Sequence, residues 1–118
     1  MPRRGTDYSS RMAYDPGLVE RVVGALDILG ERATRQKNVF GGRGFLVGKS
    51  TFVIVWEDGL LVKTPRAEYP YLLTLPGITP FAPDGERPMT TWVVVSAEVV
   101  ADDPELVDWV QRGLRAIR

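Results

Sequence analysis

The Gly48-Lys49-Ser50 tripeptide has the residues that end a phosphate-binding P-loop. A P-loop has the fixed spacing Gly-x-x-x-x-Gly-Lys-Ser/Thr, because a loop of that length lets backbone N–H groups surround a phosphate. Arg43 stands where the first glycine belongs, and the residues after Ser50 are β-branched or aromatic, as in a strand. We therefore interpret the tripeptide as a turn between strands and not as a nucleotide site.

A second glycine motif, Gly42-Arg43-Gly44, begins like a dinucleotide-binding fingerprint. That fingerprint needs a third glycine and has to connect a strand to a helix, whose N-terminus receives the pyrophosphate. Val47 occupies the place of the third glycine, and the surrounding residues have the pattern of a hairpin. The motif therefore favours a structural turn.

Residues suited to catalysis are scarce. The chain has no histidine and no cysteine, so the commonest general base near neutral pH and the thiolate nucleophile are both missing. Glu57 and Asp58 are adjacent carboxylates, but consecutive residues of an exposed turn seldom point into one pocket. Asp102 and Asp103 precede an amphipathic segment and indicate a helix cap rather than a metal site. We expect no catalytic residue, no metal, no cofactor and no enzymatic activity.

Basic residues surround the first expected strand, at Arg32, Arg35, Lys37 and Arg43. They could contact phosphates, or they could be solvated charges that keep an edge strand from pairing with other chains. The second interpretation is favoured, because no aromatic residues are interleaved with them in a stacking pattern. The formal net charge of +0 also argues against strong direct binding of nucleic acid.

Two stretches remain as candidates for a binding site. The first is the glycine turn that follows the first strand, and the second lies in a proline-containing loop. The candidate binding residues are Phe40, Gly41, Gly42, Arg43, Arg87, Pro88 and Met89. Arginine beside a tight turn suits an anion, so the alternative of a small-molecule-binding domain would place its pocket near these stretches.

The elements that would position these residues fit a single domain. The chain has 118 residues, of which 44% are hydrophobic and 25% are charged, as in ordinary globular proteins. No apolar run approaches the ~20 residues of a membrane-spanning helix, and the arginines near Met1 are not followed by the apolar stretch expected of a secretory signal. Residues 1–12 are polar and aperiodic, which predicts a disordered N-terminal extension to a domain at 13–118. A cytoplasmic location is expected, and it is compatible with the absence of cysteine.

The strands form the centre of the expected fold. β-Branched and aromatic residues separated by glycine turns predict an antiparallel meander, and Asp58-Gly59 predicts a hairpin turn. Alternation places Phe52 on the same face as Ile54 and Trp56, and the opposite face of that strand is also apolar. It should therefore be a central strand covered on both sides, or one face meets a partner chain. The expected strands are 34–40, 45–47, 51–56, 60–63 and 91–95, and a loop is expected at 78–89.

Helices are expected on both sides of the meander in the chain. Asp15-Pro16 caps the first helix, and Gly30 ends it. The second helix is short, begins near Ala67 or Glu68 because Pro70 does not fit a helix interior, and ends at Pro76-Gly77.

The last helix begins at Asp103-Pro104 and has Trp109 as its main apolar anchor. Its acidic residues lie at the start and its arginines at the end, which matches the helix dipole. Together these elements predict an α+β fold, with an antiparallel sheet of about five strands and three helices in the order α-β-β-β-β-α-β-α.

Several of these stretches, in their order and spacing, resemble the TfoX N-terminal domain family. They are Met12-Ala13-Tyr14-Asp15-Pro16-Gly17-Leu18, Val39-Phe40-Gly41-Gly42-Arg43-Gly44-Phe45, Asp58-Gly59-Leu60-Leu61, Leu75-Pro76-Gly77, Arg87-Pro88-Met89 before Trp92-Val93-Val94-Val95, and Trp109-Val110. The family usually has methionine at the place of Val39, and charged residues in the helix that here contains Pro70. The resemblance implies a bent antiparallel sheet with flanking helices, like the secretion-chaperone-type folds.

Proteins of the family's namesake type regulate competence for DNA uptake and carry a second, C-terminal domain. This chain ends at Arg118, just after the expected last helix, so the resemblance implies a stand-alone N-terminal domain. The family offers no established catalytic or ligand residues. We expect a non-enzymatic cytoplasmic regulatory or protein-interaction domain with an unknown protein partner, and self-association into a homodimer stays open. The alternatives are a small-molecule, anion-binding domain and an accessory domain in the regulation of transcription or DNA uptake.

Overall fold

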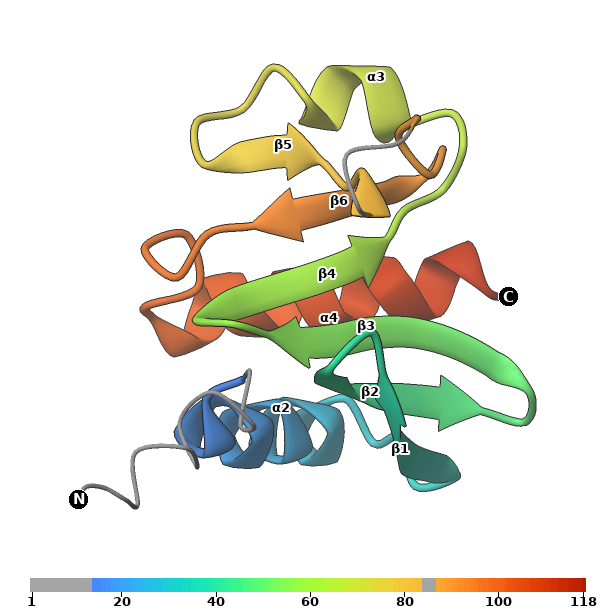
Figure 1. Cartoon of the computed structure of the whole chain (residues 1–118). Coiled ribbons are helices and arrows are strands. Elements are labelled where there is room, and N and C mark those ends of the chain that lie inside the picture. The colour runs from blue at the N-terminus through green and yellow to red at the C-terminus, as the bar shows by residue number, and fades with distance from the viewer. Residues whose placement is uncertain (1–13, 84–86) are drawn as a thin grey trace, which may run out of the picture.

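The computed structural model describes residues 14–83 and 87–118. In this part of the chain, six antiparallel strands form one sheet in the order β1-β2-β3-β4-β6-β5, with three helices (Figure 1). The elements are α2 (Pro16–Ile28), β1 (Thr34–Val39), β2 (Gly42–Val47), β3 (Ser50–Trp56), β4 (Gly59–Lys63), α3 (Tyr69–Leu72), β5 (Ile78–Pro80), β6 (Trp92–Val95) and α4 (Asp103–Ala116). The α+β fold is confirmed, with one more strand than expected. The expected extension at 1–12 lies outside the described residues.

The additional strand is β5, which lies in the segment 78–89 that was expected to be a loop. Ile78 lies opposite Val95 of β6, and Pro80 lies opposite Val93. β5 forms an edge of the sheet. Proline is tolerated in an edge strand because the N–H that it lacks would have pointed to solvent and not to a neighbouring strand. The prediction of a loop was wrong because proline, which is typical of turns, is also compatible with an edge strand.

The position of β3 confirms the expectation of a central strand. It lies between β2 and β4, and its residues from Phe52 to Val55 are all buried. β1 forms the other edge of the sheet, also as expected. The hairpin turn between β3 and β4 consists of Glu57 and Asp58, because Trp56 lies opposite Gly59.

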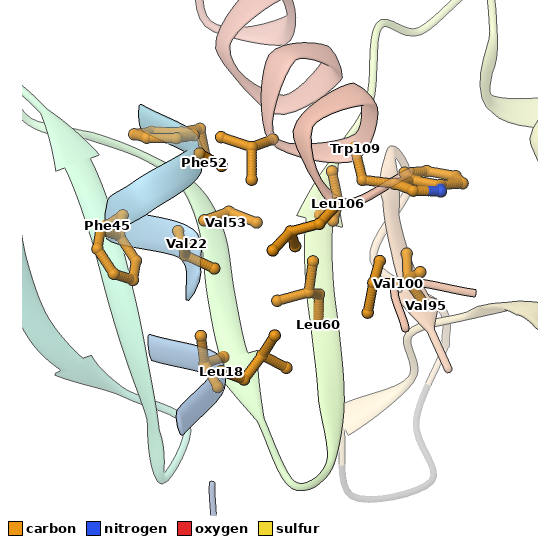
Figure 2. Packing of buried hydrophobic residues seen from close by; sticks show 14 of the residues in the cluster. Leu18, Val22, Phe45, Phe52, Val53, Leu60, Val95, Val100, Leu106 and Trp109 are labelled. Carbon is orange, nitrogen blue, oxygen red and sulfur yellow. The ribbon is translucent and has the colours of Figure 1, made fainter. Parts of the chain in front are cut away.

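Two long helices cover one face of the sheet, which we call the helix-facing side. Helix α4 crosses behind β3 and β4, and α2 packs beside α4 (Figure 1). Between them, Val22 of α2 and Leu106 of α4 meet Val53 and Leu60 of the sheet (Figure 2). Trp109 is only 5% exposed in this cluster, which confirms it as an anchor of α4.

The ends of α2 and α4 agree with the capping residues of the sequence, with one shift, whereas α3 ends at Leu72 and not at the expected Pro76-Gly77. Asp15 accepts a hydrogen bond from the Gly17 N–H at 2.8 Å, and Gly30 follows α2 with φ of +74°. The N-cap of α4 is Asp102 and not Asp103, whose carboxylate instead pairs with Arg21 of α2 at 3.0 Å. α3 is a single short turn, as Pro70 predicted. None of the described helices combines the length and apolar character that crossing a membrane requires.

Phe52 does not share a face with Ile54 and Trp56, which corrects the simple alternation. It belongs to the helix-facing core, together with its neighbour Val53. The register explains this arrangement, because Phe45 and Leu46 of β2 lie opposite Val53 and Thr51, so Phe52 is an extra residue of β3. Such a β-bulge bends the strand and redirects a side chain.

Ion pairs hold α4 to the segment that precedes α3. Glu68 accepts hydrogen bonds from Arg115 at 2.7 Å and from Arg112 at 3.2 Å. The hydrogen bond from Arg115 is the main reason why the pKa of the Glu68 carboxyl lies below its usual value. Arg112 also lies over the ring of Trp109, with 4.5 Å between its guanidinium carbon and the ring centroid. Arg112 and Arg115 of α4 therefore have structural partners.

Candidate functional site

The face of the sheet opposite the helices, which we call the outer side, carries a small aromatic cluster. Phe81, at the start of the loop after β5, lies between Phe40 and Trp56. Its ring centroid is 5.4 Å from that of Phe40 and 5.5 Å from that of Trp56, both in edge-to-face geometry. These three rings and Pro83 line an open cleft of about 330 Å3. We call this cleft, together with Met89 and Trp92, which pack against the same cluster as Trp56, the aromatic surface.

Backbone hydrogen bonds hold the loop after β5 in place over the outer side. The Met89 N–H donates to the Phe81 carbonyl at 2.8 Å, and the Trp92 N–H donates to the Met89 carbonyl at 3.0 Å. Beneath the loop, Ile54 and Leu61 are buried against Phe81. The described ends of this loop thus form a fixed wall of the cleft.

Strained backbone lies next to the aromatic residues of this surface. Among the described residues, three that are not glycine have positive φ: Phe40 at 54°, Glu57 at 53° and Thr91 at 76°. Glu57 directly follows Trp56, and Thr91 directly precedes Trp92. Such conformations cost energy and cluster at functional sites. Thr91 is held by the buried Thr64, whose N–H and hydroxyl both donate to the Thr91 carbonyl, at 2.7 and 2.9 Å.

The Phe40 position is unusual for a two-residue hairpin. Val39 lies opposite Gly42, so Phe40 and Gly41 are the turn residues, and both have positive φ. That combination defines a type I′ turn, in which asparagine or glycine is normally found. Phe40 is nevertheless a large apolar residue, and it is 52% exposed.

Two glycines of β2 allow close contacts within the sheet. A side chain at Gly42 would place its Cβ 2.3 Å from the carbonyl oxygen of Val55, and one at Gly44 would reach Val39 at 2.9 Å. Gly42 was expected in the turn, but it is a buried residue of β2. Its role is therefore close packing against β3, which only glycine allows.

The structure separates the predicted site residues. Phe40 and Met89 both belong to the aromatic surface, since Phe40 contacts Phe81 and Met89 packs against the cluster that contains Phe81. Arg43 lies on the helix-facing side instead, where it donates to the side chains of Gln36 at 2.9 Å and Asn38 at 3.1 Å. Arg87 and Pro88 are exposed, and Gly41 is the exposed second residue of the turn.

Trp56 and Phe81 belong to the site but were not among the predicted site residues. The alternation around Ile54 did place Trp56 on an apolar face, so a signal for it was present. Phe81 had no such signal, because it stands between Pro80 and Ala82 in a segment with repeated turn residues. Phe81 follows the strand β5, which pairs with β6, and it packs on the outer side against Ile54 and Leu61.

The side chains that line the cleft are apolar or aromatic. None of them is ionisable, so they offer aromatic and van der Waals contacts. Within residues 14–83 and 87–118, no three side chains of His, Cys, Asp or Glu gather as metal ligands would.

The fold and this surface can be compared with known proteins. A comparison with curated proteins found no significant match. The TfoX N-terminal domain family matches residues 28–117, from the end of α2 to the end of α4. The matched stretch contains the whole sheet and all residues of the aromatic surface. The chain belongs to the TfoX N-terminal domain family.

Proposed function

We propose that this domain is a non-enzymatic, cytoplasmic protein-interaction module with a regulatory role, and that the aromatic surface is where it contacts its partner. The observation that carries this proposal is the conformation and exposure of Phe40. A residue whose backbone is strained and whose ring is half exposed contributes little to folding. Its geometry suits a contact with another molecule, since exposed aromatic residues beside a hollow are typical anchors of protein interfaces.

The neighbouring residues support the same role. Phe81 and Trp56 form a preorganised apolar recess, and the strand and loop around them are fixed by backbone hydrogen bonds. A rigid recess loses little conformational entropy when a partner side chain enters it. The cleft is large enough for one aromatic or aliphatic side chain, at about 330 Å3.

Binding of a small anion has less support. A second cleft of about 510 Å3 lies between α2 and β1, and it is lined by Arg32, Arg35 and Arg43. Asp27 and Glu31 line the same cleft, and Arg43 already donates to two amide side chains. These contacts reduce the positive charge and the donors that an anion would find.

Affinity capture from native lysate, with the tagged full chain as bait, tests the proposal. We compare the wild type with Phe40→Ala and with the control Tyr71→Ala, which removes another exposed ring, 64% exposed on α3. The proposal expects at least one protein to be retained by the wild type and by Tyr71→Ala but lost with Phe40→Ala. Circular dichroism verifies that each variant is folded.

Equal retention by all three baits would contradict the proposal. A homodimer is a distinct outcome, in which the captured protein is the bait itself. Sedimentation of the purified chain identifies it, because the wild type and Tyr71→Ala would dimerise while Phe40→Ala would stay monomeric. A dimer that persists in Phe40→Ala would place self-association elsewhere and count against the aromatic surface.

A further inference from the structure

Strand β1 is an edge of the sheet with an open side. It pairs with β2, and in the described part of the chain it has no second strand neighbour. Its four central residues, from Arg35 to Asn38, are all exposed. An edge of this kind presents unpaired N–H and C=O groups in a row, which is the template for an added strand.

The register of the hairpin identifies those groups. Val39 and Gly42 flank the two-residue turn and therefore exchange backbone hydrogen bonds with each other. In an antiparallel pair such bonded positions alternate, so Lys37 and Arg35 also direct their N–H and C=O groups to β2. The backbone groups of Thr34, Gln36 and Asn38 consequently point to the open side.

The opposite edge of the sheet is blocked by proline, whereas β1 is guarded only by the charges of Arg35 and Lys37. β5 has three residues and ends in Pro80, which has no N–H to offer. β1 has six residues, none of which is proline or glycine. Hydrogen bonds of its side chains also tie it to β2 and to the turn that follows β2. Arg43 holds Gln36 and Asn38, and Arg35 donates to the Gly48 carbonyl at 2.8 Å.

The charges of β1 select what can pair there. Arg35 and Lys37 lie on one face of the strand, and Arg32 precedes it. If two copies of β1 paired antiparallel around Gln36, Arg35 of one copy would lie opposite Lys37 of the other, and like charges in that position are destabilising. A strand with carboxylates at alternate positions would instead place them opposite Arg35 and Lys37.

We propose that the open edge of β1 binds an extended acidic segment of a partner protein as an additional strand. Backbone hydrogen bonds to Thr34, Gln36 and Asn38 supply the pairing, and Arg35 and Lys37 select the acidic sequence. The inference rests on the proposed role as an interaction domain, but it uses a surface that is separate from the aromatic cleft.

The test uses the full chain, labelled with 15N, and two synthetic peptides. The probe is the peptide Thr-Glu-Val-Glu-Val-Thr, and its counterpart replaces both glutamates by lysine. We expect saturable shifts of the Thr34, Gln36 and Asn38 amide signals with the glutamate peptide, and affinity about fivefold weaker for the lysine peptide. Unchanged amide signals at millimolar glutamate peptide, or equal affinity for both peptides, would refute the inference.

Two variants make the result specific. Gln36→Pro removes an outward N–H while the bonds of its neighbours to β2 remain, so it should abolish the shifts, with the β2 signals as a check of folding. Arg35→Glu with Lys37→Glu should reverse the preference toward the lysine peptide. The control Lys49→Glu with Arg66→Glu changes the same net charge at exposed residues outside β1 and should leave the preference intact.

The two proposals fail separately. If the peptide does not bind but protein capture still depends on Phe40, only the β1 inference is refuted. If the peptide binds at β1 while capture ignores Phe40, the aromatic surface is refuted and the edge remains. If the variant with Arg35→Glu and Lys37→Glu still prefers the glutamate peptide, Arg35 and Lys37 do not select the partner.

Discussion

The two faces of the sheet differ in what their apolar residues achieve. On the helix-facing side, one continuous buried cluster contains residues of both long helices and of every strand except β1. On the outer side, the buried part consists of Ile54, Leu61 and Phe81, and partly exposed rings surround it. The same strands serve both faces, since alternate residues of β3 and β4 point in opposite directions.

This difference separates stability from recognition. Burial of apolar surface stabilises by roughly 25 cal/mol per Å2, so the larger helix-facing cluster dominates the free energy of folding. The outer side buries less and retains rings that a partner can reach. Substitutions on the helix-facing side should therefore mainly lower the free energy of unfolding, whereas substitutions on the outer side should mainly weaken binding. Four measurements test this.

The largest effect is expected from Trp109→Ala on the helix-facing side. Trp109 is almost fully buried between α4 and the sheet, so its truncation leaves a cavity and should cost about 3–5 kcal/mol of unfolding free energy. Urea denaturation followed by circular dichroism measures the change. A midpoint equal to that of the wild type would show that α4 does not depend on this anchor.

Phe81→Ala should cost less, about 2–3 kcal/mol, because its cluster is small and the open cleft lets solvent fill the lost volume. The same denaturation experiment measures it, with the exposed Tyr71→Ala expected within about 0.5 kcal/mol of the wild type. If Phe81→Ala destabilised as much as Trp109→Ala, the two faces would contribute equally and the comparison would fail.

The Glu68 ion pairs add a smaller and pH-dependent contribution on the helix side. Because the pKa of Glu68 is lowered in the folded protein, its stabilisation is present above the usual carboxyl pKa and is lost as the pH falls through the lowered value. Glu68→Gln should therefore cost about 0.5–1 kcal/mol near neutral pH and less near pH ~3, where more of the carboxyl is protonated. Urea midpoints of both proteins at the two pH values measure this.

The control for that experiment is Arg115→Met, which removes the main hydrogen-bond partner of Glu68 but keeps an unbranched side chain. It should reproduce the loss at neutral pH and also reduce the pH dependence. A cost that is the same at both pH values would assign the effect to packing rather than to charge.

The smallest effect on stability is expected from Phe40→Asn. Asparagine tolerates a backbone with positive φ better than phenylalanine does, which should raise the free energy of unfolding by about 0.5–1 kcal/mol. Loss of the ring contact with Phe81 should lower it by a similar amount. The unfolding free energy should thus change by less than about 0.5 kcal/mol. Partner capture should nevertheless be lost, and a variant that captures its partner normally would show that Phe40 has no special role in binding.

Sequence reasoning predicted most of the helix-facing side. Its helices have periodic apolar residues, and Asp15 and Gly30 mark the ends of α2 by local chemistry. The outer side was predicted less well, because it depends on contacts between residues distant in the chain. Phe40 was identified through its neighbouring glycines, whereas Phe81 became visible only when β5 was seen to pair with β6.

The register caused the other differences. Alternation cannot reveal an extra residue in a strand, so Phe52 was assigned to the wrong face. Arg43 was grouped with Phe40 because the two are close in sequence, but Arg43 lies on the side of β2 that its neighbour Phe45 also faces. Short separation in a sequence does not mean a shared face in a strand.

The close approach of α4 to the backbone at Phe52 also has an evolutionary consequence. A side chain at Gly113 would put its Cβ 2.7 Å from the Phe52 carbonyl oxygen, so the helix can approach β3 only while position 113 lacks one. Glycine within a helix costs roughly 1 kcal/mol relative to alanine. Because the obstacle is the backbone of β3, glycine at 113 should be retained wherever α4 packs this closely on the sheet, and Gly113→Ala should push the helix away from β3.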